Sequence, residues 1–185
     1  RLKNRSVLAH ELFHKLQFQY VDAMPFSADL AASGYCWPSS PNLFGAWVGE
    51  GQAALMGSRW SDELDAYDGT DYFGKQSAYF RGQGGYRFTD SPLTEVSYAA
   101  SLFWSYCSEQ MGADLTPPLH GTDLVRTFWE TAQTANGANP QYNWVEATDS
   151  IGLLDSVIAS RGRGSVAEVF HDFAIACYAH ELDRP

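Results

Sequence analysis

The chain of 185 residues is long enough for one domain with a substantial core, and we treat 1–185 as a single domain. Hydrophobic residues make up 45% of it and charged residues 18%, which excludes an intrinsically disordered protein. A formal net charge of −10 argues against nucleic acid and anionic membrane surfaces as partners, and no apolar run reaches the roughly 18 residues of a membrane span.

Hydrophobic spacing and turn residues predict a mainly α-helical chain with about six helices and almost no strand. In chain order, the predicted helices span 5–21, 45–59, 94–111, 122–135, 146–160 and a last stretch from Ser165 onward. The segment 22–44 contains three prolines and is expected to be mostly loop. The segment 61–93 is rich in Asp, Gly, Tyr and Ser, and its length suggests an irregular region with a function.

The first predicted helix has apolar side chains at helical spacing, and we expect the helix to be buried on that side. These apolar residues are Val7, Leu8, Leu12, Phe13 and Leu16. The chain opens on Arg1, with neither an initiator methionine nor a signal peptide, and enters this helix almost at once. We therefore expect the C-terminal part of a longer protein, with an upstream segment of the same protein as a partner.

Two of the later helices carry recognisable end signals. Gly112 follows the third predicted helix at the position where a glycine commonly ends a helix in the left-handed conformation. Ser165, with Glu168 three residues on, has the spacing of a capping box at the start of the last helix. The apolar face expected for that last helix consists of Val166, Val169, Phe170, Phe173 and Ile175.

The residues His10-Glu11-Leu12-Phe13-His14 form an H-E-x-x-H motif within the first predicted helix. The i, i+4 spacing places both imidazoles on one helical face, where they can bind a single zinc ion. Glu11 lies about 100° further round the helix, where it can reach a metal-bound water as a general base. The alternative is a pair of ordinary histidines, but the apolar neighbours predict a buried helix on which such groups need partners.

Two histidines leave a catalytic zinc one protein ligand short, and Glu50 is the best candidate for the third. It follows His14 by 36 residues and lies on the second predicted helix, which can face the first across a loop. A metzincin would need glycine and histidine where this chain has Gln17 and Tyr20. Alternatives remain: Glu50 as a solvated carboxylate at a helix start, and Asp71 as the ligand in an aspzincin-like element whose spacing is out of register.

The motif H-E-L-F-H, followed by W-x-x-E-G-x-A over Trp47–Ala53, resembles those of the gluzincin zinc metallopeptidases. The resemblance is closer to the aminopeptidase-like and hyicolysin-like branches than to thermolysin, whose relatives carry Asp where this chain has Ala54. It extends over about 6–180, because Ser97–Trp104 and Val169–Ala174 are also similar to secreted bacterial members. Acidic, lysine-poor and aromatic-rich composition is common in secreted microbial enzymes as well, so we expect a secreted or extracellular protein.

The resemblance implies one zinc ion per chain, bound by His10, His14 and Glu50, with Glu11 as the base. The expected fold is the helical part of a zincin-type catalytic domain, whose β-sheet would precede this chain. The expected function is zinc-dependent hydrolysis of a peptide bond in a peptide or protein substrate, in which Glu11 activates a zinc-bound water. The alternative is a catalytically inactive binding or structural module that keeps zinc for stability.

A zinc peptidase also needs a donor to the oxyanion that develops during the reaction. Tyr98 matches a tyrosine common in aminopeptidase-like gluzincins and is the first candidate, with Tyr79 and His171 as alternatives. Asp172 is a further candidate for orienting a ligand histidine, against a plain surface role. Five acidic residues offer oxygens suited to calcium, with a solvated loop as the preferred interpretation. They are Asp62, Glu63, Asp65, Asp68 and Asp71.

Overall fold

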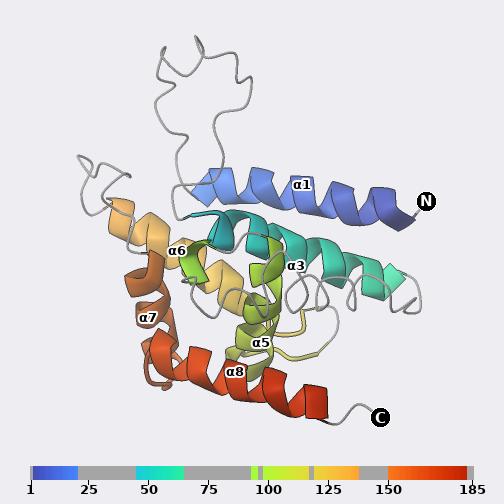
Figure 1. Ribbon diagram of the computed structural model, residues 1–185. Helices are drawn as coiled ribbons and strands as arrows, with labels where there is room; N and C mark the ends of the chain where they lie inside the picture. The colour runs from blue at the N-terminus through green and yellow to red at the C-terminus, as the bar shows by residue number, and fades with distance from the viewer. Residues whose placement is uncertain are drawn as a thin grey trace.

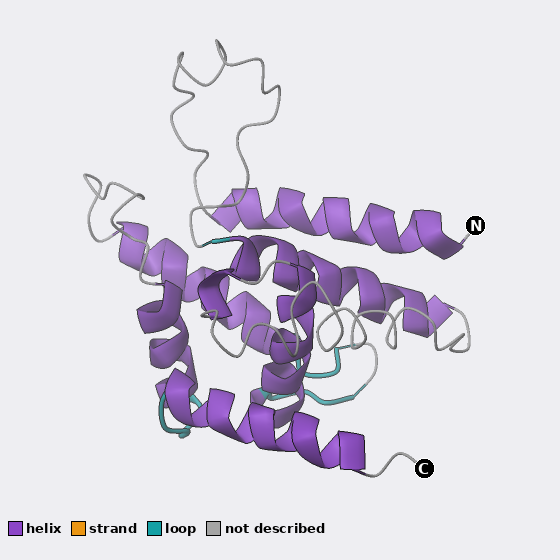
Figure 2. Ribbon diagram, in the orientation of Figure 1, coloured by secondary structure: helices purple, strands orange, loops and turns teal. Residues whose placement is uncertain are grey.

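In the computed structural model, the residues described are 2–20, 45–64, 93–95, 98–116, 119–137 and 150–182. Within these ranges the chain forms six α-helices and two short 3₁₀ turns, with no strand, so the mainly α prediction is confirmed for this part (Figure 2). In chain order the elements are α1 (Leu2–Tyr20), α3 (Ala46–Leu64), η2 (Leu93–Glu95), η3 (Tyr98–Ala100), α5 (Ser101–Met111), α6 (Asp123–Gly137), α7 (Ser150–Ser160) and α8 (Val166–Leu182).

Helix α3 is the centre of the arrangement. Helix α1 runs antiparallel to it on one side, while η2, η3 and α5 pack against α3 from other directions (Figure 1). Helix α6 contacts α1, α5 and α7, and α8 closes the opposite side of the molecule by packing on α5 and α7. The H-E-x-x-H helix is therefore an outer layer, and its inner face looks onto α3.

Small residues allow the neighbours of α3 to come close. Gly49, Gly51, Ala53 and Ala54 are all buried along this helix. A Cβ atom added at Gly51 would lie 2.9 Å from the Cβ of Ala100, closer than packed side chains approach one another. The glycine that follows Glu50 is thus the reason that η3 can dock beside that carboxylate.

Three buried tryptophans fix α3 to its neighbours through their indole N–H groups. Trp104 Nε1 donates to the backbone oxygen of Trp47 at 2.8 Å, and the two rings stack with centroids 5.2 Å apart. Trp47 Nε1 donates to Ser150 Oγ at 3.2 Å, and Trp129 Nε1 donates to Gln52 Oε1 at 2.7 Å. Because each of these three indoles has a polar partner, α3 forms a stable support for the site that it carries.

The third predicted helix, 94–111, is only partly correct. Its first half is broken into η2 and η3, and the regular helix α5 begins at Ser101. The contact of Ala100 with Gly51 accounts for this path, because a tertiary contact overrides the local helical preference. The helix ends before Gly112 as predicted, but this glycine does not adopt the left-handed conformation. Gly112 is extended, with φ −64° and ψ 146°, and a Cβ there would collide with the backbone of Gly121.

The other predicted helices are confirmed with shifted ends. The second extends to Leu64, so 61–64 are helical and not irregular, while 22–44 and 65–92 lie outside the described residues. The capping box is confirmed, since Ser165 N donates to Glu168 Oε2 at 2.7 Å and Glu168 N donates to Ser165 Oγ at 3.3 Å. Of the apolar face predicted for α8, Ile175 is the error, with 54% of its surface exposed.

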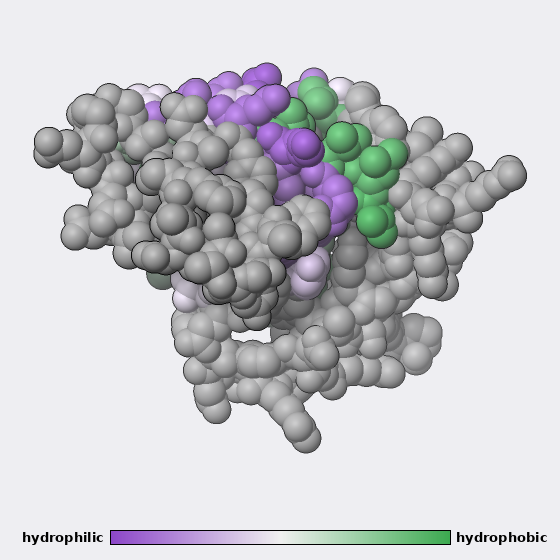
Figure 3. Space-filling view, turned by 90° about the horizontal axis from the view of Figure 1, so that it is seen from above, coloured by the Kyte–Doolittle hydropathy of each residue, from purple (hydrophilic) through white to green (hydrophobic). Residues whose placement is uncertain are grey.

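The expectation of a buried first helix is wrong for most of its apolar residues. Val7, Leu8, Leu12 and Leu16 are 49–58% exposed, and Figure 3 shows hydrophobic surface beside hydrophilic surface on this face of the molecule. Only Phe13 and Tyr20 among its described apolar side chains pack on the core. The inner face of α1 is used instead by polar groups, His10, His14 and the buried Gln17.

No helix among the described residues combines the length and the apolar character needed to cross a membrane. Of the three cysteines in the chain, Cys107 is a free thiol within the core, and its burial raises the pKa of that thiol well above the ordinary value. Cys36 lies outside the described residues. Cys107 is therefore a packing residue and not a reactive one.

Candidate metal centre

The side chains of His10, His14 and Glu50 converge between α1 and α3. The distance from His10 Nε2 to Glu50 Oε2 is 3.1 Å, and His14 Nε2 lies 3.0 Å from His10 Nε2 and 3.5 Å from Glu50 Oε2. Among the described residues this is the group of histidine, cysteine and acidic side chains that could hold a metal ion. All three side chains are partly buried, so a cation between them would be shielded on the protein side.

These separations fit the coordination shell of zinc. Tetrahedral zinc with bonds of about 2.0–2.1 Å places neighbouring ligand atoms about 3.3 Å apart. The three observed separations, 3.0, 3.1 and 3.5 Å, bracket that value. The donor set of two imidazole nitrogens and one carboxylate oxygen suits zinc as well, so the residues present fit the ion implied by the motif.

The geometry follows from two helices and their spacing. His10 and His14 are one turn apart on α1, with ring centroids 4.6 Å apart. Glu50 lies one turn after Trp47 on α3, and the full burial of Trp47 fixes which way this part of α3 faces. The antiparallel contact of α1 and α3 then brings the carboxylate opposite the imidazoles.

His10 is kept in the form that a metal needs. Burial lowers the pKa of His10, and the adjacent His14 lowers it further. The charges of Glu50 and Glu11 act in the opposite direction but do not outweigh them. A neutral imidazole can donate its lone pair to a cation, whereas a protonated one cannot.

Glu11 and Tyr98 lie at the open side of this group. Glu11 is exposed, and its charge acts on both His10 and Tyr98. The ring of Tyr98 stacks on His10 with centroids 5.7 Å apart, and 57% of Tyr98 is exposed. Partial burial raises the pKa of Tyr98, and the charge of Glu50, a hydrogen bond between Tyr98 and Glu50, and the charge of Glu11 raise it further. The phenol therefore keeps its proton.

Gln17 was not predicted from the sequence to belong to the site, where its residue type counted only as a departure from the metzincin pattern. Gln17 is 2% exposed, and its side chain contacts His14 and the backbone of Gly49. The signal that could have found it is its position three residues after His14, on the same face of the helix. A polar residue there is suited to orient a ligand histidine.

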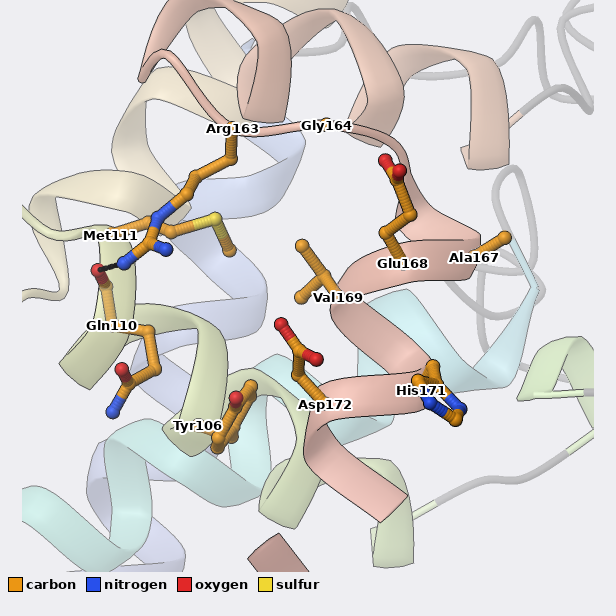
Figure 4. A pocket seen from close by; sticks show the side chains of 10 residues that line it. All are labelled: Tyr106, Gln110, Met111, Arg163, Gly164, Ala167, Glu168, Val169, His171 and Asp172. Carbon is orange, nitrogen blue, oxygen red and sulfur yellow. Dashed lines mark hydrogen bonds between the residues drawn. The ribbon is translucent and has the colours of Figure 1, made fainter. Parts of the chain in front are cut away.

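Other candidates from the sequence lie elsewhere. His171 and Asp172 are on α8, where they line a cavity of about 600 Å³ between α5 and α8 (Figure 4). They are therefore not the oxyanion donor or the orienting carboxylate of the group between α1 and α3. Asp71 and Tyr79 lie outside the described residues, as do Asp65 and Asp68 of the candidate calcium segment.

Two of the charged groups that line the cavity between α5 and α8 have hydrogen-bond partners. Arg163 Nη2 donates to the backbone oxygen of Gln110 at 3.4 Å, and the Glu168 carboxylate accepts hydrogen bonds at the start of α8. Burial raises the pKa of Tyr106, and the charge of Asp172 raises it further. No three ligand atoms converge here among the described residues.

Comparison of the chain with protein-family models, curated proteins and solved structures returns no significant match in any of the three. The motif and the geometry of the group between α1 and α3 are therefore the observations that bear on its function.

Proposed function

We propose that this chain is a zinc metallopeptidase of the gluzincin type, with His10, His14 and Glu50 holding the metal. The observation that carries the proposal is the convergence of two imidazole nitrogens and one carboxylate oxygen at 3.0–3.5 Å. A base and a phenol at the rim of the same group favour catalysis over a purely structural zinc, which needs ligands alone. The net charge of −10 and the aromatic content support a secreted or extracellular location.

Each residue has a defined part in the proposed hydrolysis. Zinc, when bound, supplies a Lewis acid for the scissile carbonyl and increases the acidity of water. Glu11 takes a proton from the attacking water while the water oxygen bonds to the carbonyl carbon. Glu11 then delivers that proton to the leaving amine as the C–N bond breaks. Tyr98 donates a hydrogen bond to the carbonyl oxygen while that oxygen gains negative charge.

The exposure of Glu11 and Tyr98 suits these roles. Both must meet a substrate that arrives from solvent, whereas the ligands need only face the metal. Glu11 is exposed on α1 and its charge acts on His10, while the Tyr98 hydroxyl remains protonated because its pKa is raised. A peptide bond is the substrate class that this combination of metal, base and oxyanion donor fits.

The test compares the wild-type chain with Glu11→Gln for zinc content and for hydrolysis of a casein substrate. We expect about one zinc per chain in both proteins, and loss of roughly 100- to 10,000-fold in turnover in the variant. His171→Gln is the matched control, since His171 lies in the cavity between α5 and α8. Wild-type turnover in Glu11→Gln would exclude the mechanism, and zinc binding without any hydrolysis by the wild type would favour a zinc-stabilised module.

A further inference from the structure

We infer that Gln17 is the positioning residue of the metal centre: it selects the tautomer of His14 and joins that histidine to the segment that carries Glu50. One amide performs both tasks. Its oxygen lies 2.8 Å from His14 Nδ1, and its nitrogen lies 3.2 Å from the backbone oxygen of Gly49. At 2% exposure, Gln17 is shielded from water that would compete for these hydrogen bonds.

The contact with Gly49 determines which way the amide faces. The Gly49 carbonyl can only accept a hydrogen bond, so the NH₂ group of Gln17 must face it. The amide oxygen then faces His14 Nδ1, and because this oxygen is purely an acceptor, Nδ1 must carry the proton. The orientation of the amide thus follows from a backbone group whose chemistry is unambiguous.

The tautomer of His14 follows from that orientation. A neutral imidazole has a single N–H, so a proton on Nδ1 leaves the lone pair on Nε2. Nε2 is the atom that lies 3.0 Å from His10 Nε2 and 3.5 Å from Glu50 Oε2. Gln17 therefore presents the metal-binding nitrogen of His14 in the form that a cation requires.

The second hydrogen bond acts on the third ligand. Gly49 directly precedes Glu50, and both lie near the start of α3. The hydrogen bond from Gln17 on α1 to the Gly49 carbonyl therefore sets the separation of the two helices beside the metal ligands. His10 has a different support, the stacked ring of Tyr98, so the two histidines are held by different means.

The chain offers a matched control for this inference. Gln52 is also a fully buried glutamine, and it lies on α3, two residues after Glu50. Its side-chain oxygen accepts a hydrogen bond from Trp129 Nε1 at 2.7 Å and belongs to the core. Removing the amide at position 52 costs a buried hydrogen bond too, but it leaves the ligands untouched.

The inference rests on the proposed function only in assuming that His14 is a metal ligand, and the experiment separates the two. Wild type, Gln17→Met, Gln17→Glu and Gln52→Met are compared by zinc affinity, measured by competition with a chromophoric chelator. In the metal-free proteins, long-range ¹H–¹⁵N spectra of the imidazoles report the tautomer of each histidine.

We expect the Nδ1–H tautomer for His14 in the wild type and a mixture of tautomers in Gln17→Met, with zinc affinity reduced roughly 10- to 100-fold. Gln52→Met should retain both the wild-type tautomer and the wild-type affinity. Gln17→Glu keeps an acceptor for Nδ1 but cannot donate to Gly49, so it should keep the tautomer while lowering stability.

An unchanged His14 tautomer in Gln17→Met, or an equal loss of affinity in Gln52→Met, would overturn the inference. If Gln17→Met does not fold, an Nε2–H tautomer in the folded Gln17→Glu protein overturns it instead. A wild-type chain that binds zinc but does not hydrolyse peptides would refute the proposed function alone. A wild-type chain that does not bind zinc would refute the proposed function and would overturn the inference as well, because His14 would then not be a metal ligand.

Discussion

The two outer faces of the molecule carry similar sets of side chains with different arrangements. The face between α1 and α3 has two histidines, carboxylates and a tyrosine, and the cavity between α5 and α8 has one histidine, two carboxylates and a tyrosine. On the first face, three ligand atoms converge within 3.5 Å of one another. On the second, Glu168 caps a helix and Arg163 contacts the backbone oxygen of Gln110.

The convergence of donor atoms, and not residue composition, distinguishes a candidate site. A carboxylate that accepts backbone N–H groups at a helix start has a structural role that accounts for it. Two imidazoles and a carboxylate whose ligand atoms converge on one point, and which contact one another rather than a helix end, fit a cation. Variants on the two faces should therefore behave differently even where the substitutions are chemically alike.

The largest contrast is expected between Glu50→Ala and Asp172→Ala. Glu50→Ala removes the only charged group among the three ligands, so zinc affinity should fall by more than the roughly 100-fold that loss of an outer hydrogen-bond partner can cost. Asp172→Ala, on the other face, should leave the affinity unchanged. Isothermal titration of zinc into the metal-free proteins measures both. Equal affinities for wild type and Glu50→Ala would show that the third ligand is another residue, with Asp71 the next to test.

The second contrast concerns two tyrosines, Tyr98 and Tyr106. Tyr98→Phe should reduce kcat more than it raises KM, because its hydroxyl is proposed to act only on the transition state. The reduction should be below the roughly 100- to 1,000-fold measured for a lost oxyanion donor, since the metal shares the charge. Tyr106→Phe should leave kcat unchanged. A Tyr98→Phe protein that has normal kcat but lower stability would make that hydroxyl a structural group.

The third prediction compares the protein with and without zinc. Zinc at 100 times its dissociation constant should add about 2.7 kcal/mol to the free energy of unfolding, because the metal binds only the folded state. For a chain of this length, that corresponds to an increase of about 5–11 °C in Tm, which calorimetry before and after chelation measures. Glu50→Ala should lose this increase at the same zinc concentration. A Tm that chelation leaves unchanged would argue against a metal held between α1 and α3.

Much of the candidate site could be predicted because it depends on helix periodicity. The spacing of His10 and His14 sets their common face, and Glu50 belongs to a second motif that the resemblance identifies. The spacing of Gln17 from His14 can indicate a contact between the two, but the second contact of Gln17 could not be predicted, because it is made with Gly49, a residue 32 positions away. Such a contact arises from the packing of α1 on α3 and leaves no local pattern in the sequence.

The fold was predictable to a similar extent. Apolar spacing indicates which residues share a helical face, but it does not show what covers that face. The exposure of Leu8, Leu12 and Leu16 could not be predicted for this reason. The break before α5 was missed because it depends on Ala100 meeting Gly51. Local signals with local partners, such as the capping box, were predicted correctly.

The smallest effect is expected from the capping box on the cavity side of the molecule. Ser165→Ala removes the oxygen that accepts from Glu168 N at 3.3 Å, so the free energy of unfolding should fall by about 0.5–2 kcal/mol. Zinc affinity should not change, because α8 packs on α5 and α7 while the metal group lies between α1 and α3. Ser165→Asp is the control, since its carboxylate can accept the same hydrogen bond and should preserve most of the stability. Chemical denaturation and zinc titration on the three proteins measure both quantities. A change in zinc affinity in Ser165→Ala would mean that the two faces are coupled through the core, which would contradict the independence assumed in each comparison above.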